Sequence, residues 1–338
     1  MIRQVYRIDR PGSIRKLKFV SEPLDAPLKN EVTVEVKAIG LNFADIFTIL
    51  GFYKAAPKRN FIPGLEFSGV IIQKGSAVND FQIGDSVMGV IKFGSYATHL
   101  NIDQRYTLKL PDEWTFDEGA SFIVNALTAF YALTKLGNLH SGGTVLIESA
   151  AGGVGIYANR IAKKFSAFTI GIVGREEKVK FAKSEGYDEV LLRDKNLKNN
   201  IRTALKDRTL DLVLEAVGGK GLTDKFNLLA PTGRMIIYGS ASFSTGKFGS
   251  NYLKLIYNYM KRPKIDTLNI IEQNRTVSGF NLIWIYDRVD MLKGMLPEIL
   301  ELNLPKPIIN ERFPFEQLPN AVARLKSGET IGKVVLTV

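Results

Sequence analysis

A chain of 338 residues, 45% hydrophobic and 23% charged, is long enough for one large or two ordinary domains, and its composition excludes a disordered protein. Cysteine is absent, which excludes disulfides, a cysteine nucleophile and a cysteine-bound zinc, and the only two histidines, His99 and His140, make a catalytic zinc a poor fit. The net charge of +11 is spread along the chain, which favours a solvated lysine-rich surface over a nucleic-acid or membrane patch. We therefore expect no nucleic-acid partner.

The sequence pattern does not predict a segment that would direct the chain to a membrane. No uninterrupted apolar run reaches the roughly 18 residues that a membrane-spanning helix needs. The N-terminal sequence MIRQVYRIDRPGS has no apolar core of the kind found in signal peptides. We expect no membrane span and a cytoplasmic location.

The first third of the chain has the pattern of a β-rich domain. Residues 31–42, EVTVEVKAIGLN, alternate apolar Val32, Val34 and Val36 with polar neighbours, which predicts a half-buried strand. Residues 44–51 form a short helical pattern that ends at Gly51. Further apolar runs are separated by turns that contain Gly and Asp, and long helices are not interleaved with them.

From about Phe122 the pattern changes to strands that alternate with helices. The predicted strands are TVLIESA, FTIGIVG, EVLLRD, LDLVLEAVG and RMIIYGSA. The predicted helices are VGIYANRIAKKF, EEKVKFAKSEG, NLKNNIRTALKD and KGLTDKFNLLAPTG. Such alternation predicts βαβ units, a parallel sheet covered on both faces and a doubly wound dinucleotide-binding domain.

The last quarter mixes strands and helices in another order, and we expect it to return to pack on the first third. It begins after an aromatic and basic segment, YLKLIYNYM, at 252–260. That segment could lie on a membrane surface, but packing at a domain or subunit boundary is the more common use of such a stripe and is the prediction here.

A cluster of glycines lies between the first predicted strand and helix of the α/β region. Gly152, Gly153 and Gly155 follow the strand and open the helix, which is the context that a phosphate-binding turn requires. The lack of a Cβ lets the backbone approach a pyrophosphate, although tight helix–strand packing alone could also require glycine. The turn is not a P-loop, because no Gly-Lys-Ser/Thr follows it.

The next strand end indicates which dinucleotide is bound. About 20 residues past such a turn, an acidic residue would bind the ribose hydroxyls of NAD, whereas an arginine would receive the 2′-phosphate of NADP. Here the strand ends at Val173, Gly174 and Arg175, with Lys178 one helical turn later and Arg193 after the following strand. Three cations around one corner suit a dianionic phosphate, so NADPH is the predicted cofactor.

These pieces together resemble the medium-chain dehydrogenase/reductase superfamily, in its zinc-independent quinone oxidoreductase branch and closest to the vesicle amine transport protein homologue subgroup. The resemblance rests on GLNFADIFTILGFY, PGLEFSG, VNALTAFYAL, LIESAAGGVG, LDLVLEAVGG, GRMIIYGSAS, NRTVSGFNL and IGKVVL, which span nearly the whole chain. It implies an α/β fold with a GroES-like β-rich catalytic domain at 1–121 and 262–338 and a Rossmann NADP-binding domain at 122–261. It also implies a homodimer joined through the edge of the Rossmann sheet.

The resemblance further implies the site residues. Tyr53 closes the GFY element and is expected to donate a hydrogen bond or a proton, and the Asn42 amide to orient the nicotinamide ribose or the substrate carbonyl. Either residue could instead only stabilise its own loop. The full set expected at the cofactor is Asn42, Asn125, Thr128, Ala151, Gly152, Gly153, Val154, Gly155, Arg175, Lys178, Arg193, Val217, Gly239, Ser240 and Phe280.

The sequence departs from zinc-dependent relatives and from its own subgroup. Asn42 and Leu65 stand at the positions where zinc-dependent relatives have metal ligands, so no metal is expected. Glu148 stands where a histidine is frequent, and Arg193 where a tyrosine commonly stacks, which leaves open whether Arg193 pairs with phosphate or stacks. Asp45 and Glu66 are expected to be structural, accepting backbone hydrogen bonds.

Without a metal, reduction of an activated double bond is easier than oxidation of an alcohol. The leading prediction is an NADPH-dependent reductase of a small-molecule quinone or α,β-unsaturated carbonyl. A 2-enoyl thioester reductase is the nearest alternative, with Lys54, Lys58 and Arg59 available to a carrier phosphate, although a solvated loop explains these cations equally well. A non-catalytic nucleotide-sensing or membrane-surface module is the alternative from another class.

Overall fold

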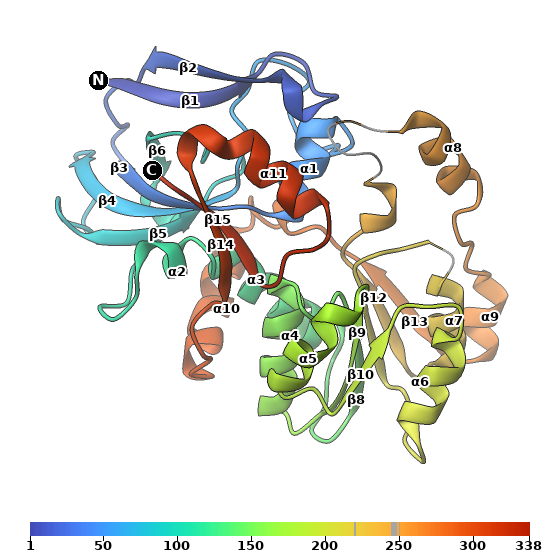
Figure 1. The fold of residues 1–338 in the computed structure, drawn as a ribbon. Helices are drawn as coiled ribbons and strands as arrows, with labels where there is room; N and C mark the ends of the chain where they lie inside the picture. The colour runs from blue at the N-terminus through green and yellow to red at the C-terminus, as the bar shows by residue number, and fades with distance from the viewer. Residues whose placement is uncertain (220, 245–248, 250) are drawn as a thin grey trace.

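The structure is a computed structural model that describes residues 1–219, 221–244, 249 and 251–338. It contains a two-stranded hairpin, a seven-stranded sheet and a six-stranded sheet. The hairpin joins β1 (Ile2–Ile8) and β2 (Leu17–Pro23) and lies over the seven-stranded sheet (Figure 1). The mixed architecture agrees with the predicted α/β class.

The seven-stranded sheet is built from both ends of the chain. Its strands, in the order β14-β15-β3-β4-β5-β7 with β6 also paired to β3, are β14 (Ile309–Pro314), β15 (Lys333–Thr337), β3 (Glu31–Gly40), β4 (Glu66–Lys74), β5 (Ser86–Val90), β7 (Thr107–Lys109) and β6 (His99–Asp103). Val32, Val34 and Val36 of β3 are buried as predicted, in a core that also takes apolar side chains from the C-terminal helix. The predicted return to the first third is confirmed for the end of the chain, because β15 pairs antiparallel with β3.

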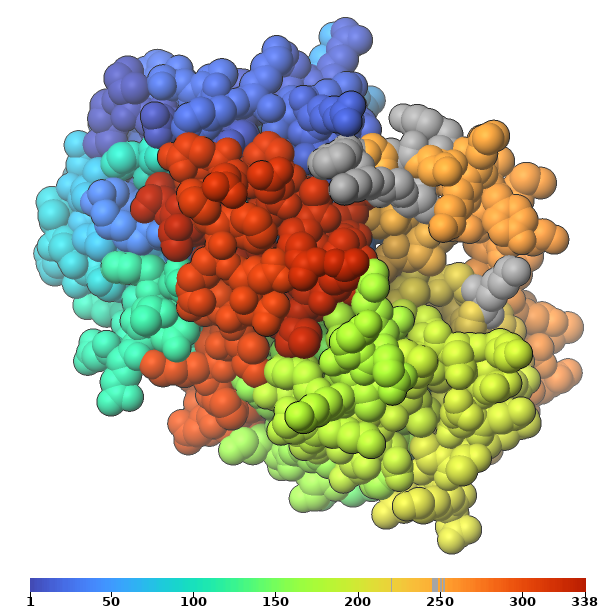
Figure 2. Space-filling view, in the orientation of Figure 1, coloured from blue at the N-terminus to red at the C-terminus, as the bar shows by residue number. Residues whose placement is uncertain are grey.

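Within the described residues, three helices flank this sheet. They are α1 (Phe43–Leu50), α2 (Phe116–Gly119) and α11 (Leu318–Lys326). The predicted end of α1 is confirmed, since Gly51 caps it in the left-handed region with φ of 81°. In the space-filling view the C-terminal residues lie between the N-terminal region and the second domain, called here the cofactor-type domain, which holds the six-stranded sheet (Figure 2).

The second sheet is parallel and has the strand order of a doubly wound dinucleotide fold. Its strands, in the order β10-β9-β8-β11-β12-β13, are β10 (Glu189–Leu192), β9 (Phe168–Val173), β8 (Thr144–Glu148), β11 (Leu212–Glu215), β12 (Arg234–Ile237) and β13 (Thr276–Gly279). The helices of this half are α3 (Ile123–Phe130), α4 (Gly153–Lys164), α5 (Val179–Ser184), α6 (Leu197–Leu205), α7 (Gly221–Leu228), α9 (Thr267–Glu272) and α10 (Val289–Glu301). All five residues of β8 are buried, as expected for a strand covered on both faces.

The sheet continues past the predicted domain boundary at residue 261. β13 pairs in parallel with β12, and Met295 of α10 belongs to the same buried cluster as Leu127 of α3. The pattern of 262–338 did not assign this strand to the parallel sheet, because a four-residue strand at a sheet edge has little periodicity. We propose that the cofactor-type domain extends through α10, and that the catalytic domain resumes with β14.

The aromatic, basic segment forms α8 (Tyr252–Met260), which projects at one side of the molecule (Figure 1). Its side chains do not pack at a domain boundary within the chain as predicted: Leu253 is 82% exposed and Met260 is 75% exposed. Packing of this helix at a boundary with a second subunit stays a prediction.

One stretch, Phe116–Leu136, is long and apolar enough to cross a membrane by length and composition, and 72% of its apolar window is buried inside the protein. It comprises α2, α3 and a π-helical segment, Tyr131–Leu136, whose side chains belong to the core of the second sheet. Its apolar character is therefore accounted for by packing.

Candidate cofactor and active site

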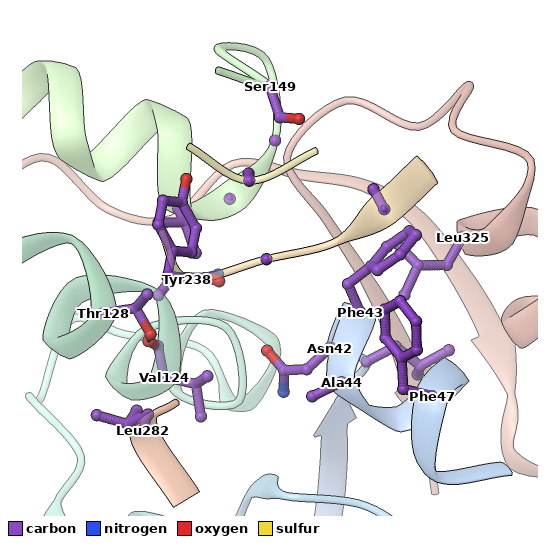
Figure 3. Close-up of a pocket in the computed structure, with 18 of the residues that line it drawn as sticks. Asn42, Phe43, Ala44, Phe47, Val124, Thr128, Ser149, Tyr238, Leu282 and Leu325 are labelled. Carbon is purple, nitrogen blue, oxygen red and sulfur yellow. The ribbon is translucent and has the colours of Figure 1, made fainter. Parts of the chain in front are cut away.

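A cavity of about 910 Å³ lies between the two sheets. It opens where the parallel strands β8, β9 and β11 end, which is where open α/β sheets bind ligands. Its other wall comes from α1 and from the segment before β15. Figure 3 shows Asn42, the N-cap of α1, and Phe43 and Phe47 of that helix across this space from Val124 and Thr128 of α3, with Ser149 at the far end.

The glycine turn forms one end of the cavity. Gly152 is the N-cap of α4, so the free N–H groups of that helix begin at the cavity. A Cβ at Gly155 would lie 2.4 Å from the Ser149 carbonyl oxygen, whereas a Cβ at Gly152 would meet only that oxygen, at 3.2 Å. Gly155 is therefore required for packing, and Gly152 is the glycine that leaves space free beside the helix N-terminus.

Of the three predicted cations, two line the outer end of the cavity and one does not. Lys178 lines it and donates to the carbonyl oxygens of Gly328 and Thr330 at 2.8 and 2.5 Å. Burial, followed by the nearby arginine charges, lowers the pKa of Lys178 to about 8. Arg193 also lines the cavity, but Arg175 is outside the lining and pairs with Glu329 at 3.0 Å.

The inner end of the cavity holds a buried lysine that the sequence analysis did not identify. Lys333 Nζ donates to Asn42 Oδ1 at 2.8 Å and to Glu66 Oε2 at 2.7 Å, and its side chain is only 4% exposed. Asn42 Nδ2 donates to the same glutamate oxygen at 3.3 Å. The only sequence indication was a lysine at the start of the apolar run KVVLTV.

Tyr53 connects the two domains at the mouth of the cavity. Its hydroxyl donates to Asn281 Oδ1 at 2.6 Å, and its ring packs edge-on against Phe93 at 6.5 Å between centroids. Burial raises the pKa of Tyr53 well above its ordinary value, so the phenol is neutral and keeps its proton for hydrogen bonding. Asn281 was not predicted, since its contact with Tyr53 spans 228 residues.

Most of the other predicted residues also lie in the cavity wall. These are Asn125, Thr128, Ala151, Gly153, Val154, Val217, Gly239, Ser240 and Phe280. Asn125 is close to the turn: a Cβ at Gly153 would lie 2.5 Å from Asn125 Nδ2. Thr128 uses its hydroxyl within α3, donating to the Val124 carbonyl oxygen at 2.6 Å.

Asp45 and Glu66 accept the backbone hydrogen bonds that were predicted for them. Asp45 Oδ2 accepts from the Asn42 N–H at 2.8 Å, and Glu66 Oε1 accepts from the Val124 N–H at 2.9 Å. Asp45 fixes the first turn of α1, and Glu66 connects the β-rich domain to α3. Both carboxylates therefore position the wall on which Asn42 lies.

We expect Asp45→Asn to change how stability depends on pH. Burial raises the pKa of Asp45 to about 7, whereas an unfolded aspartate titrates near 3.9. Between pH 3.9 and about 7, Asp45 is ionised in the unfolded chain but still protonated in the folded protein. The wild-type free energy of unfolding therefore falls as pH rises through this range, by at most about 4 kcal/mol. Asparagine keeps the acceptor for Asn42 and does not titrate. Urea unfolding at pH 4.5 and 7.5 should show a smaller decrease for the variant, and parallel profiles would contradict this account.

The residues at the inner end do not form a metal site. Within 1–219, 221–244, 249 and 251–338, no group of three or more His, Asp or Glu side chains is placed to hold a metal ion. Asn42 and Glu66 are already bound by the Lys333 ammonium, and Leu65 is apolar and buried. This donor set does not fit zinc.

A GroES-like sheet built from both chain ends, a parallel dinucleotide-type sheet and a cavity between them define a two-domain oxidoreductase fold. The family description "Alcohol dehydrogenase GroES-like domain" matches residues 28–112, and "Zinc-binding dehydrogenase" matches residues 153–299. The chain belongs to the medium-chain dehydrogenase/reductase superfamily, whose members bind nicotinamide cofactors.

Among known proteins, the human synaptic vesicle membrane protein VAT-1 homolog is 30% identical over 332 residues, covering 96% of this chain and 84% of its own. The Escherichia coli quinone oxidoreductase complexed with NADPH has a TM-score of 0.85 at 24% identity, with 100% of both chains covered. The CurK enoyl reductase has a TM-score of 0.84 at 24% identity, covering 99% of each chain. At these identities the two structures support the fold alone.

Proposed function

We propose that the protein is an NADPH-dependent, metal-independent reductase of quinones or α,β-unsaturated carbonyls. The observation that carries the proposal is that one cavity joins a glycine turn and two cations, Lys178 and Arg193, to hydrogen-bond donors at its other end. The E. coli quinone oxidoreductase with the same fold was solved with NADPH, which supports the proposed cofactor.

The residues present fit a dinucleotide. The space beside Gly152 and the N-terminus of α4 would receive the pyrophosphate, with N–H groups and a positive helix end directed at it. Lys178 and Arg193 would bind the 2′-phosphate; Arg175 would reach it only after leaving Glu329. Asn42, Asn125, Thr128, Val217, Gly239, Ser240 and Phe280 would surround the remainder.

When bound, NADPH supplies a hydride to the carbon β to the activated carbonyl. Negative charge then develops on the carbonyl oxygen of the substrate, and donors placed in advance stabilise it. Tyr53 is the donor that we propose, exchanging Asn281 Oδ1 for the substrate oxygen as its acceptor. Asn42 is fixed by Lys333 and Glu66 and would orient the ribose or carbonyl beside it.

The cofactor choice is tested by Lys178→Met. Replacing the ammonium should weaken NADPH binding by about tenfold to a hundredfold, because a hydrogen bond to a charged group contributes about 1.5–3 kcal/mol, and should leave NADH binding nearly unchanged. Titration followed by nicotinamide fluorescence measures both. Lys180→Met, on an exposed lysine in the first turn of α5, two residues along the chain, is the matched control. Equal losses of affinity for NADPH and NADH would show that Lys178 does not bind the 2′-phosphate.

The catalytic role of Tyr53 is tested by Tyr53→Phe. We expect kcat for an enone or quinone to fall by roughly a hundredfold, with NADPH affinity unchanged, because only the donor to the developing oxyanion is lost. Asn281→Ala is the companion variant: it removes the present acceptor of Tyr53 but not the phenol, and should retain most activity. If Tyr53→Phe turned over normally, the non-catalytic binding module would become the better reading.

A 2-enoyl thioester reductase is a second candidate, because Lys54 lines the cavity mouth and the CurK enoyl reductase shares the fold. Lys58 and Arg59 are exposed nearby and could meet a carrier phosphate. Competition between an enoyl thioester and a simple enone in one assay would distinguish the two activities.

We also propose that the protein forms a homodimer through the edge of the parallel sheet. β13 is one of the two edge strands of that sheet within the described chain, the other being β10, and the adjoining α9 exposes Leu268 at 62% and Ile271 at 75%. An unpaired strand edge beside apolar side chains is a suitable surface for pairing with a second copy.

A further inference from the structure

A cluster of four charged side chains lies beneath the floor of the cavity. Lys225 of α7 is 2% exposed and contacts Glu148 Oε1 and Glu215 Oε2, which are both fully buried. Glu148 ends β8 and Glu215 ends β11, the two strands at which the sheet changes winding direction. Arg193, just after β10, completes the cluster through Glu148.

Each carboxylate uses its second oxygen to accept hydrogen bonds from a different part of the cavity wall. Glu148 Oε2 accepts from Arg193 Nε at 3.2 Å and from Nη2 at 2.5 Å. Glu215 Oε1 accepts from the N–H groups of Val217 and Gly218, both at 2.8 Å. Arg193 and Val217 both line the cavity, so a single lysine connects two separate parts of its wall.

The charges within the cluster balance: two carboxylates face one ammonium and one guanidinium. Burial favours the neutral form of Glu148, but Lys225 and Arg193 outweigh it and keep the pKa of Glu148 below its ordinary value. Buried charge sets stabilise a fold little more than apolar side chains of similar volume would. Their contribution is geometric, because each member fixes the orientation of the next.

We propose that Lys225 and Glu148 are positioning residues for the adenosine end of the cofactor, acting through Arg193. Glu148 fixes two nitrogens of the guanidinium, and Lys225 keeps Glu148 in the orientation that does so. Arg193 Nη1 then faces Gly174 at the end of β9: a Cβ there would lie 2.8 Å from it. This nitrogen is left for the phosphorylated ribose, which makes the inference dependent on the proposed function.

The test measures binding of 2′,5′-ADP and 5′-AMP by calorimetry, since these ligands differ only in the 2′-phosphate. Glu148→Gln and Lys225→Met should each weaken the binding of 2′,5′-ADP by about tenfold and the binding of 5′-AMP much less. In an Arg193→Ala background, neither change should weaken 2′,5′-ADP further, because the residue through which they act is gone. Lys198→Met, which removes an exposed lysine paired with Asp224, is the matched control and should bind as wild type.

A merely structural role predicts another pattern. If the two substitutions weakened 2′,5′-ADP as much in the Arg193→Ala background as in the wild type, or did not weaken it at all, the inference would be overturned. Should Lys225→Met fail to fold, Glu148→Gln decides alone, because the carboxamide keeps the shape of the carboxylate. Failure of the wild type to bind either nucleotide would instead overturn the proposed cofactor, and the inference with it.

Discussion

Gly152→Val should fold and lose NADPH. The residue has extended backbone angles that valine adopts readily, φ of −87° and ψ of 164°, and its added Cβ would meet only the Ser149 carbonyl oxygen at 3.2 Å. The side chain would occupy the space into which we place the pyrophosphate. Losing two hydrogen bonds to a charged group costs about 3–6 kcal/mol, so affinity should fall about 10²–10⁴-fold. NADPH fluorescence titration and a thermal melt measure the two properties together.

Substitutions at two other glycines are the controls for this prediction. Gly155→Ala should destabilise the fold itself, since its Cβ would lie 2.4 Å from a backbone oxygen. Gly294→Val, on an exposed face of α10 with no heavy atom within 4 Å of the new Cβ, should leave NADPH affinity unchanged. If Gly152→Val bound NADPH as tightly as the wild type, the turn would serve only helix packing.

The elements that the sequence predicted well are those whose evidence is local. The alternation of Val32, Val34 and Val36 specified β3, and Gly51 specified the end of α1, because periodicity and left-handed glycine are properties of a few neighbouring residues. The glycine turn could be recognised for the same reason. Its geometry follows from the strand before it and the helix after it.

The parts that the sequence could not predict depend on contacts between distant segments. Lys333 reaches Asn42 across 291 residues, and Lys225 reaches Glu148 across 77. A lysine in an apolar run resembles a surface residue until the topology places a carboxylate beside it. The pairing of Arg175 with Glu329, 154 residues away, is likewise invisible in the sequence, although it determines which cations face the cavity.

Lys333→Met should destabilise the protein by about 3–5 kcal/mol, the effect expected when one member of a buried ion pair is removed. Glu66 is fully buried and would be left with only the Asn42 amide and the Val124 N–H as partners. Urea unfolding at pH 7 measures the loss. The matched control is Lys37→Met, whose pair with Glu35 at 2.6 Å is about one-third exposed and should contribute less than about 1 kcal/mol.

A second substitution separates the charge from the packing. Lys333→Met combined with Glu66→Gln should recover most of the lost stability, because glutamine retains an acceptor for Val124 without a buried charge. The double variant would still lack the cation that fixes Asn42, so its enone reductase activity should remain low while its fold is restored. Recovery of both properties would show that Lys333 only neutralises Glu66. Recovery of stability without activity would show that Lys333 also orients Asn42 in the active site.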